Sequence, residues 1–251
     1  IYAKPPKEVG EDPGIVWKIK KAVYGLCDAP RAWYAELSKY LIELGMKKSR
    51  YDNCFWIFRD ENGVLLGILS THVDDILYAG DPKFYKSIIE PLAAKWKHGV
   101  RALLPFAYTG VEITKVENGY GVHMRKYISE IALLNLARER YANHQSVLTP
   151  AGVGMYRGKL GETQWAVFQS RPDSCVECSF LASRTTKALV EDFLRLAKLV
   201  KTLKDPNNDY VLSFLFTNVP LHETAIHVWV DSSFGSLTPE TAQGGVLVFL
   251  G

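Results

Sequence analysis

The chain contains 251 residues, of which 47% are hydrophobic and 23% are charged, and its formal net charge is +3. This is the composition of a globular protein with buried cores, and it excludes an intrinsically disordered chain. No apolar run reaches membrane-spanning length and no signal peptide is visible, so we expect an intracellular protein with no membrane partner. The mildly basic charge permits a polyanionic partner without requiring one.

The first fifty residues predict an irregular lead-in followed by one helix. Residues 1–14 are rich in Pro, Gly and Lys, which favours loop structure, and residues 16–19 fit a short strand. Gly25 and Pro30 then bracket a turn. After this turn, apolar side chains recur at helical spacing, at Trp33, Leu37, Tyr40, Leu41 and Leu44. We therefore expect a helix that begins just after the turn and stops at Gly45.

The stretch VLLGILSTHVDDILYAG, residues 64–80, carries the most informative pattern in the sequence. A strand-like apolar run leads into Asp74 and Asp75, and a second apolar run follows them. Two adjacent carboxylates between segments that favour burial would cost several kcal/mol in desolvation and repulsion unless a cation neutralises them. The simplest geometry is a β-hairpin with the pair at its turn. Such a pair would bind Mg²⁺ together with substrate phosphates.

An alternative interpretation is a surface hairpin in which the two aspartates merely favour the turn. The flanking apolar residues argue against a solvated tip and favour the metal site. We therefore expect Asp74 and Asp75 at a tight turn between antiparallel strands, one of them preceded by a strand at residues 54–59. We expect this hairpin to belong to a three- or four-stranded sheet packed on helices.

The middle of the chain mixes strands with helices, which predicts an α+β fold. Residues 84–96 have helical spacing, with a kink expected at Pro91. Residues 108–116 and 120–124 flank a turn and predict a second hairpin. A helix is expected after it, over about 126–140.

The C-terminal third predicts a linker, a helix and further strands. Residues 142–170 are glycine-rich and weakly periodic, so we expect the linker between two domains there. A long helix is expected from a cap at Ser183 or Thr185 to Lys204. Strands are expected after it, over residues 210–216, 225–230 and 245–250. The second of these strands leads into another carboxylate, Asp231, which we expect in a separate small sheet far from the first pair.

Four irregularly spaced cysteines suggest a reducing compartment rather than a disulfide framework. Cys175 and Cys178 have the spacing of a redox or zinc pair. No second pair of cysteines and no suitably spaced histidine pair completes a zinc set, so two cysteines on a helix are the favoured interpretation.

Residues 16–34 read VWKIKKAVYGLCDAPRAWY, and residues 72–75 read HVDD. These two blocks are similar to VWKLKKALYGLKQAPRAWY and YVDD, which are found in the reverse transcriptases of copia-type LTR retrotransposons. Seven blocks in all follow the family's order across nearly the whole chain. The other five are IYAKPP (1–6), YDNCF (51–55), TGVEI (109–113), RPD (171–173) and DSSFG (231–235).

The resemblance implies a right-hand polymerase fold with fingers, palm and thumb, followed by a connection and an RNase H domain. The expected parts are a partial reverse transcriptase without its first palm motif at 1–141, a linker and connection helix at 142–208, and the truncated start of an RNase H-like domain at 209–251. The implied partners are an RNA or DNA template–primer, deoxynucleoside triphosphates and the rest of the Pol polyprotein. The implied location is a cytoplasmic particle, the nucleus, or both.

The same resemblance assigns roles to individual residues. In this family, palm carboxylates hold two Mg²⁺ (or Mn²⁺) ions for nucleotidyl transfer, and Asp74 and Asp75 match one motif of that set. Asp231 matches the first carboxylate of an RNase H metal site. The segment expected to line the nucleotide and template pocket, with the lysines expected to face phosphate, comprises Lys20, Lys21, Gly25, Leu26, Asp28, Pro30 and Arg31.

Several departures from the family pattern bear on activity. The family's other palm aspartate lies upstream of Ile1, so we expect this chain by itself to be inactive. His72 replaces a tyrosine, and Asp28 replaces a pocket glutamine and adds negative charge where a triphosphate would bind. Ser233 stands where the family often has a second RNase H aspartate.

The sequence therefore leaves three candidate functions. The first is the polymerase segment of a copia-type element, and the second is a decayed or co-opted remnant that binds nucleic acid without catalysis. The third, which needs no resemblance, is a metal-dependent phosphohydrolase built on Asp74 and Asp75. That enzyme would need further His, Asp or Glu ligands, and the nearest candidate is His72.

Overall fold

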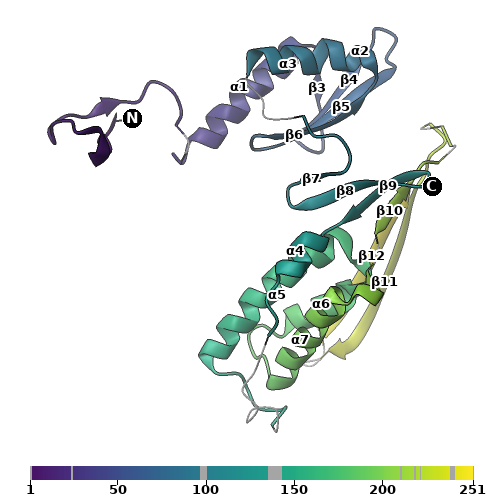
Figure 1. Cartoon of the computed structure of the whole chain (residues 1–251). Helices are drawn as coiled ribbons and strands as arrows, with labels where there is room; N and C mark the ends of the chain where they lie inside the picture. The colour runs from purple at the N-terminus through teal and green to yellow at the C-terminus, as the bar shows by residue number, and fades with distance from the viewer. Residues whose placement is uncertain are drawn as a thin grey trace. The chain divides into compact units, whose positions relative to one another are not determined.

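The chain forms two compact units, Ile1–Arg101 and Ala102–Gly251, which are described separately (Figure 1). The computed structural model describes residues 2–23, 25–96, 101–134, 143–209, 211–217, 219–220, 222–237 and 241–250. Strands and helices alternate irregularly in both units, so the α+β prediction is confirmed.

The first unit contains a four-stranded antiparallel sheet with helices on one face. The strand order is β3-β4-β5-β6, made by Lys47–Lys48, Phe55–Arg59, Leu65–His72 and Asp75–Gly80. Helix α1 (Ala29–Glu43) precedes the sheet. A continuous helical stretch follows it, made of α2 (Pro82–Phe84), the π-helical η2 (Tyr85–Ile89) and α3 (Glu90–Lys95).

The N-terminal lead-in is irregular, as expected from its composition. It contains the short antiparallel pair β1 (Tyr2–Ala3) and β2 (Trp17–Lys18), with the 3₁₀ turn η1 (Lys7–Val9) between them. The helix expected after Pro30 is present as α1, which begins with Ala29 and Pro30 in its first turn. The kink expected at Pro91 takes the form of the π-helical turn η2 directly before α3.

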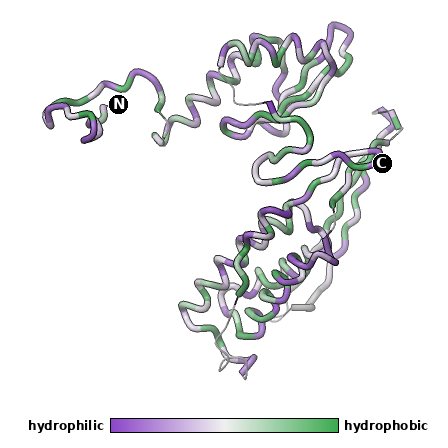
Figure 2. The backbone as a smooth tube through the Cα atoms, viewed as in Figure 1, coloured by the Kyte–Doolittle hydropathy of each residue, from purple (hydrophilic) through white to green (hydrophobic). Residues whose placement is uncertain are grey.

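The core of the first unit lies between the sheet and these helices. Side chains from α1, β4, β5 and the stretch from α2 to α3 meet there, and Figure 2 shows apolar residues along the same segments. The largest fully buried side chains among them are Trp56, Phe84, Leu37, Leu41, Leu69, Ile88 and Leu92. The expectation of a small sheet packed on helices is therefore confirmed.

The second unit combines a second four-stranded antiparallel sheet with a helical core. The sheet has the order β10-β9-β8-β7, made by Leu212–Leu215, Gly119–His123, Val111–Val116 and Phe106–Tyr108. Its α-helices are α4 (Arg125–Glu130), α5 (Pro150–Ser170), α6 (Cys175–Ser183) and α7 (Val190–Lys204). Two 3₁₀ turns, η4 (Pro172–Ser174) and η5 (Pro206–Asn208), follow α5 and α7. A separate two-stranded sheet contains β11 (Ile226–Leu237) and β12 (Thr241–Leu250).

Several sequence-based expectations are wrong in this unit. The segment expected to be a linker, 142–170, contains the 21-residue helix α5. The helix expected over 126–140 is present as α4, which already ends at Glu130. Residues 135–140 of the expected helix lie outside the described part of the chain. The strand expected at 108–116 is two strands, because positive φ angles at Thr109 and Gly110 turn the chain between them.

The helix expected from a cap at residue 183 or 185 to Lys204 is present, but it begins later than predicted. Helix α6 ends at Ser183, and α7 begins at Val190, where the Asp192 carboxylate accepts a hydrogen bond from the Leu189 amide at 2.9 Å. Strand β10 pairs with β9, so part of the expected segment 209–251 belongs to the sheet of the second unit. The assignment of domains by family resemblance stays a prediction.

Candidate metal-binding hairpin

The two adjacent carboxylates lie at the turn of a β-hairpin, as the sequence predicted. Strands β5 and β6 pair antiparallel, and the last pair before the turn joins His72 to Asp75. Val73 and Asp74 are therefore the two central residues of the turn. Leucine, isoleucine and threonine in the strands favour extended structure, while the aspartates favour the turn.

The turn has a strained backbone that the sequence did not reveal. Val73 has a φ of 53°, in the left-handed region. The first central position of a type II′ turn requires a positive φ and usually holds glycine, and a β-branched residue there costs about 1–3 kcal/mol. Among the described residues, Trp33 Nε1 on α1 reaches this turn from outside the hairpin and donates a hydrogen bond to the carbonyl oxygen of Val73 at 2.7 Å.

The sheet register places Asp75 on the face that the helices do not cover. Trp56, Leu69 and Tyr78 form one cross-strand row, and this row packs in the core beneath the helices. Because side chains alternate along a strand, Asp75, three residues before Tyr78, belongs to the opposite face. Within the first unit, the helices therefore leave the Asp75 face of the sheet uncovered.

Both carboxylates are exposed to solvent, which corrects one sequence-based expectation. Apolar flanks predict that the pair is buried and that a cation is necessary to neutralise it. In the structure the tip is solvated: Asp74 and Asp75 are exposed, and Val73 between the strands is 57% exposed. The desolvation cost therefore does not arise, and the flanking apolar residues are accommodated in the sheet behind the tip.

The pair still fits a hard divalent cation by its donor chemistry. Mg²⁺ is usually bound through one or two carboxylates, while water and substrate phosphates complete its coordination. Asp74 and Asp75 supply such carboxylates from consecutive positions of one rigid element. Within the described residues, no group of three or more His, Cys, Asp or Glu side chains is arranged to hold a metal ion.

Glycine residues let a helix approach the sheet closely behind the turn. The positions where a Cβ of Gly67 or Gly80 would stand are occupied by the ring of Phe84, in both cases closer than real Cβ contacts. These two glycines are cross-strand partners in β5 and β6. The base of the hairpin is therefore held against α2, while its tip carries the carboxylates.

The segment expected to contact nucleotide lies just before α1. Gly25 has a φ of 92°, which other residues rarely adopt, and no atom lies within 4 Å of where its Cβ would stand. Asp28 occupies the N-cap position of α1 without accepting a capping hydrogen bond through its side chain. Most of the expected contact residues are exposed and Leu26 is partly buried; the exposed ones are Lys20, Lys21, Gly25, Asp28, Pro30 and Arg31.

The structure connects this segment with the hairpin turn through α1. Arg31 lies in the first turn of that helix, and Trp33, two residues later, makes the hydrogen bond to Val73. Two regions 40 residues apart in sequence therefore meet at the turn. Helical spacing in the sequence assigns Trp33 to the core and gives no sign of the indole hydrogen bond.

The third expected carboxylate lies in a different sheet. Asp231 is exposed on β11 opposite Gly245 of β12, and its Oδ1 accepts a hydrogen bond from the Ser232 amide at 2.9 Å. The prediction of a separate small sheet is confirmed. Nothing in this sheet shows a metal role for Asp231, which stays a prediction.

The cysteine pair is located on a helix, as the sequence indicated. Cys175 and Cys178 are one turn apart on α6, and both are free thiols. Burial, followed by the charges of neighbouring groups, raises the pKa of Cys178 to about 11 and also raises the pKa of Cys175. Both thiols are therefore neutral near pH 7, whereas metal binding and redox exchange require the thiolate.

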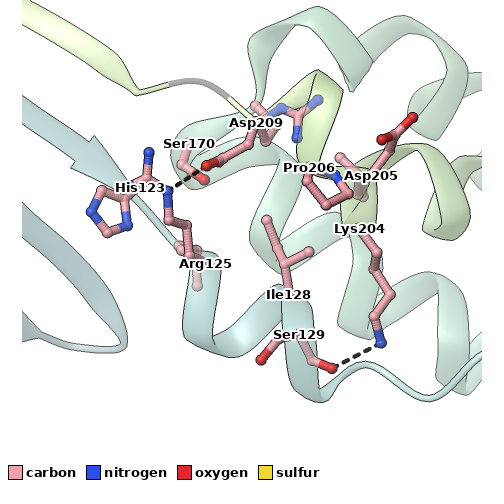
Figure 3. A pocket seen from close by; sticks show the side chains of 12 residues that line it. His123, Arg125, Ile128, Ser129, Ser170, Lys204, Asp205, Pro206 and Asp209 are labelled. Carbon is pink, nitrogen blue, oxygen red and sulfur yellow. Dashed lines mark hydrogen bonds and ion pairs between the residues drawn. The ribbon is translucent and has the colours of Figure 1, made fainter.

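A cavity of about 250 Å³ lies between α4, α7 and the segment after α7 (Figure 3). Its charged side chains already have partners. Arg125 Nε donates to Asp209 at 2.7 Å, and Lys204 Nζ donates to the carbonyl oxygens of Ser129 and Ile131 at 2.8 and 2.6 Å. These contacts hold α4 against the end of α7, which makes the cavity a structural feature of the second unit.

None of the helices in the described part of the chain combines the length and the apolar character needed to cross a membrane. This finding concerns the described residues only.

Comparison with known proteins gives one consistent result. The family model described as "Reverse transcriptase (RNA-dependent DNA polymerase)" matches residues 1–150. The chain is similar to the retrovirus-related Pol polyproteins from transposons RE1 and RE2 of Arabidopsis thaliana, with 27% and 26% identity over 99% of the chain. It is also 35% identical, over 86 residues and 33% of its length, to the Pol polyprotein from transposon TNT 1-94 of Nicotiana tabacum, where the match covers 6% of the relative.

The chain spans only 17% of the length of the two Arabidopsis relatives. No solved structure is significantly similar to it.

Proposed function

This chain belongs to the reverse transcriptase family of copia-type retrotransposon Pol polyproteins, and from that premise we propose that it supplies the metal-binding hairpin of an RNA-directed DNA polymerase. One observation carries the proposal: Asp74 and Asp75 stand at an exposed turn, with Asp75 on the uncovered face of a four-stranded sheet. Substrate as large as a template–primer duplex needs such an open face. In this proposal the duplex and the deoxynucleoside triphosphates are the partners of the chain.

Asp74 and Asp75 are the residues that would hold the divalent cations, Mg²⁺ or Mn²⁺. When bound, such ions would supply the charge that activates a primer 3′-hydroxyl and neutralises the triphosphate of the incoming nucleotide. The contribution of the chain is to present both carboxylates from one short turn whose strands are fixed by the sheet. The remaining ligands would come from water, from substrate phosphates and from other parts of the polyprotein.

The segment before α1 is proposed to bind the nucleotide and template. Arg31, Lys20 and Lys21 are exposed and would contact phosphate, while Gly25 allows the backbone to approach closely. The amide groups at the N-terminus of α1 also favour a negatively charged group. Pro30 in the first turn of α1 fixes the backbone there without losing a helical hydrogen bond.

The finer architecture is proposed by family resemblance. We place the partial fingers, palm and thumb in 1–141, a connection in 142–208 and the start of an RNase H-like domain in 209–251. Asp231 would be one metal ligand of that last domain. The rest of the Pol polyprotein would complete both sites, in a cytoplasmic particle or in the nucleus.

Two observations favour a second candidate, a remnant that binds nucleic acid without catalysis. Asp28 is exposed at the start of α1, where its charge opposes a triphosphate. His72 pairs with Asp75 across the hairpin, at the position where the family has a tyrosine. Both departures lie close to the proposed chemistry, so activity has to be measured.

The test is primer extension on poly(rA)·oligo(dT) with Mg²⁺ or Mn²⁺, using the protein extended upstream of Ile1 to include the family's other palm motif. Asp74→Asn should lower the extension rate by about a hundredfold or more, because it removes a charge that holds the metal. Glu61→Gln is the matched control, since it removes an exposed carboxylate from the neighbouring hairpin turn. We expect this variant to retain activity.

The outcomes separate the two candidates. Extension that Asp74→Asn abolishes and Glu61→Gln preserves supports the polymerase. No extension by the folded, unsubstituted protein, with template–primer binding intact, supports the remnant. Equal loss in both variants would contradict a specific role of the hairpin.

A further inference from the structure

The turn that presents the carboxylates is held from outside the hairpin by the indole of Trp33. Its Nε1–H donates to the carbonyl oxygen of Val73 at 2.7 Å. The Trp33 ring is partly buried and packs edge-to-face on Trp96, with 5.2 Å between ring centroids. Trp96 packs in the same way on Tyr40 of α1, at 5.3 Å. The indole is therefore oriented by aromatic contacts that do not involve the hairpin.

The carbonyl oxygen of Val73, which accepts this hydrogen bond, belongs to the Val73–Asp74 peptide group, and the orientation of that peptide determines the turn type. Type I′ and type II′ turns both have a positive φ at the first central residue, and they differ by a flip of the peptide between the two central residues. In type I′ the second residue also has a positive φ, whereas in type II′ its φ is negative. Val73 has a φ of 53° and Asp74 does not have a positive φ, so the turn is of the II′ kind.

A flip of this peptide would break the Trp33 hydrogen bond. It would also move Asp74 into the left-handed region and redirect its carboxylate relative to Asp75. Nothing in the identity of Val73 favours the observed arrangement, because a β-branched residue is disfavoured at either kind of turn. The negative φ of Asp74 already favours this turn type, and among the described residues the indole hydrogen bond of Trp33 adds a contact to the peptide group that would flip.

We propose that Trp33 is a positioning residue for the Asp74–Asp75 pair: its indole fixes the Val73–Asp74 peptide and so sets the direction of the Asp74 carboxylate relative to Asp75. The metal-related part of this inference rests on the proposed function of the pair. Because Arg31 precedes Trp33 by two residues on α1, the same bond sets the start of that helix relative to the carboxylates. Trp33 thereby couples the proposed nucleotide segment to the proposed metal pair.

The first measurement uses the unmodified chain and needs no variant to fold. Hydrogen exchange of the indole N–H groups, followed by NMR, should be several-fold slower for Trp33, whose ring is partly buried against Trp96, than for Trp17, whose ring is 38% exposed and whose indole donates to Glu11. Mn²⁺ titrated into the same sample should broaden the Trp33 indole signal and the amide signals of residues 73–76. Indole exchange of Trp33 as fast as that of Trp17 would overturn the proposal.

The second measurement removes the donor and keeps the ring. Trp33→Phe should speed amide exchange at residues 73–76 and weaken Mn²⁺ binding at the turn by about three- to tenfold, the range expected for one hydrogen bond. Trp17→Phe, which removes an indole hydrogen bond elsewhere in the same unit, should change neither quantity. A purely structural role for Trp33 would lower the melting temperature without a selective change at the turn.

Asp74→Asn separates failure of the proposal from failure of the proposed function. If Asp74→Asn leaves the Mn²⁺ broadening unchanged, the metal assignment is wrong. If Asp74→Asn removes the broadening while Trp33→Phe leaves both turn exchange and Mn²⁺ affinity at the values of the unmodified chain, the metal assignment stands and the positioning role is refuted.

Discussion

The two units treat their polar side chains in opposite ways. In the first unit, the candidate functional carboxylates Asp74 and Asp75 are exposed at the end of a hairpin. In the second unit, the guanidinium of Arg171 is almost fully buried and binds Asp173 through two hydrogen bonds of 3.0 and 2.9 Å. The buried hydroxyl of Tyr156 likewise donates to the Leu181 carbonyl oxygen at 2.7 Å. The hairpin carboxylates of the first unit are therefore open to a ligand, whereas Arg171 and Tyr156 of the second unit use their polar groups for packing.

This contrast explains why the cavity between α4 and α7 in the second unit is a structural feature and not a candidate site. A buried polar group is costly unless it is paired, so a stable core pairs it. An exposed carboxylate has no such requirement and can remain open for a cation. Whether a charged side chain is buried or exposed therefore distinguishes structural charges from candidate functional charges more reliably than the presence of the charge alone.

The largest effect is expected when a core side chain is removed from the second unit, which tests whether its core and the exposed hairpin turn of the first unit are independent. Phe193 on α7 is 1% exposed and belongs to the helical core, so Phe193→Ala should lower the free energy of unfolding of that unit by about 3–5 kcal/mol. Hydrogen exchange with mass spectrometry measures both units in one sample. Phe168→Ala is the matched control, because Phe168 on α5 is 58% exposed.

Exchange at the hairpin turn should be unchanged by Phe193→Ala if the two units are energetically independent. Faster exchange at residues 73–76 in this variant would show that the turn depends on the second core, and the contrast between the units would fail.

A smaller effect is expected where α2 meets the base of the hairpin. A Cβ on Gly67 would overlap the ring of Phe84, so Gly67→Ala should destabilise the first unit by about 1–3 kcal/mol through overpacking. The measurement is denaturant unfolding monitored for the first unit by hydrogen exchange. The change should also weaken Mn²⁺ binding, because the hairpin must shift away from α2.

A second substitution tests whether overlap with the Phe84 ring is what destabilises Gly67→Ala. Phe84→Leu shortens the side chain that the new methyl group meets, so the double variant should be less destabilised than the sum of the two single variants. Additive losses would mean that Gly67 is required for a reason other than its contact with Phe84.

The sequence is sufficient to predict the hairpin because the pattern there is local. Apolar runs predict strands, and two aspartates between them predict a turn, so the place of Asp74 and Asp75 at that turn follows from the residue pattern alone. The hydrogen bond from Trp33 could not be predicted in the same way. It joins residues 40 positions apart, and a helical spacing of apolar residues assigns Trp33 equally well to a core.

The left-handed φ of Val73 is also beyond the sequence. Valine is disfavoured in that region, so its identity argues for ordinary extended backbone. The tertiary contacts that hold the turn override this preference. The prediction that the carboxylates are buried is wrong for a related reason. Apolar flanking residues indicate that the strands pack against other elements, but they do not indicate how far the turn projects beyond those elements into solvent.

The largest error concerns α5, where composition is misleading. Glycines at several positions between 150 and 170 suggest a linker, yet the segment is a helix capped by Thr149, whose side chain accepts a hydrogen bond from the Gly152 amide at 3.3 Å. Helical spacing of buried residues is present beneath the glycines, at Tyr156, Leu160, Thr163, Ala166, Val167 and Ser170. Packing of this face against the core compensates for the poor helix propensity of glycine.

That explanation predicts that the exposed glycines of α5 weaken the second unit without serving its packing. Gly154 and Gly158 are exposed, and no atom lies within 4 Å of where a Cβ would stand at either position. Gly154→Ala or Gly158→Ala should each raise the free energy of unfolding of this unit by about 0.5–1 kcal/mol, because alanine loses less backbone entropy in a helix. Gly152→Ala should gain less, since its Cβ would meet Leu148 and Thr149 at 3.4 Å. A loss of stability at Gly154 or Gly158 would show that this face of α5 is covered, and that glycine is retained there for close contact rather than tolerated.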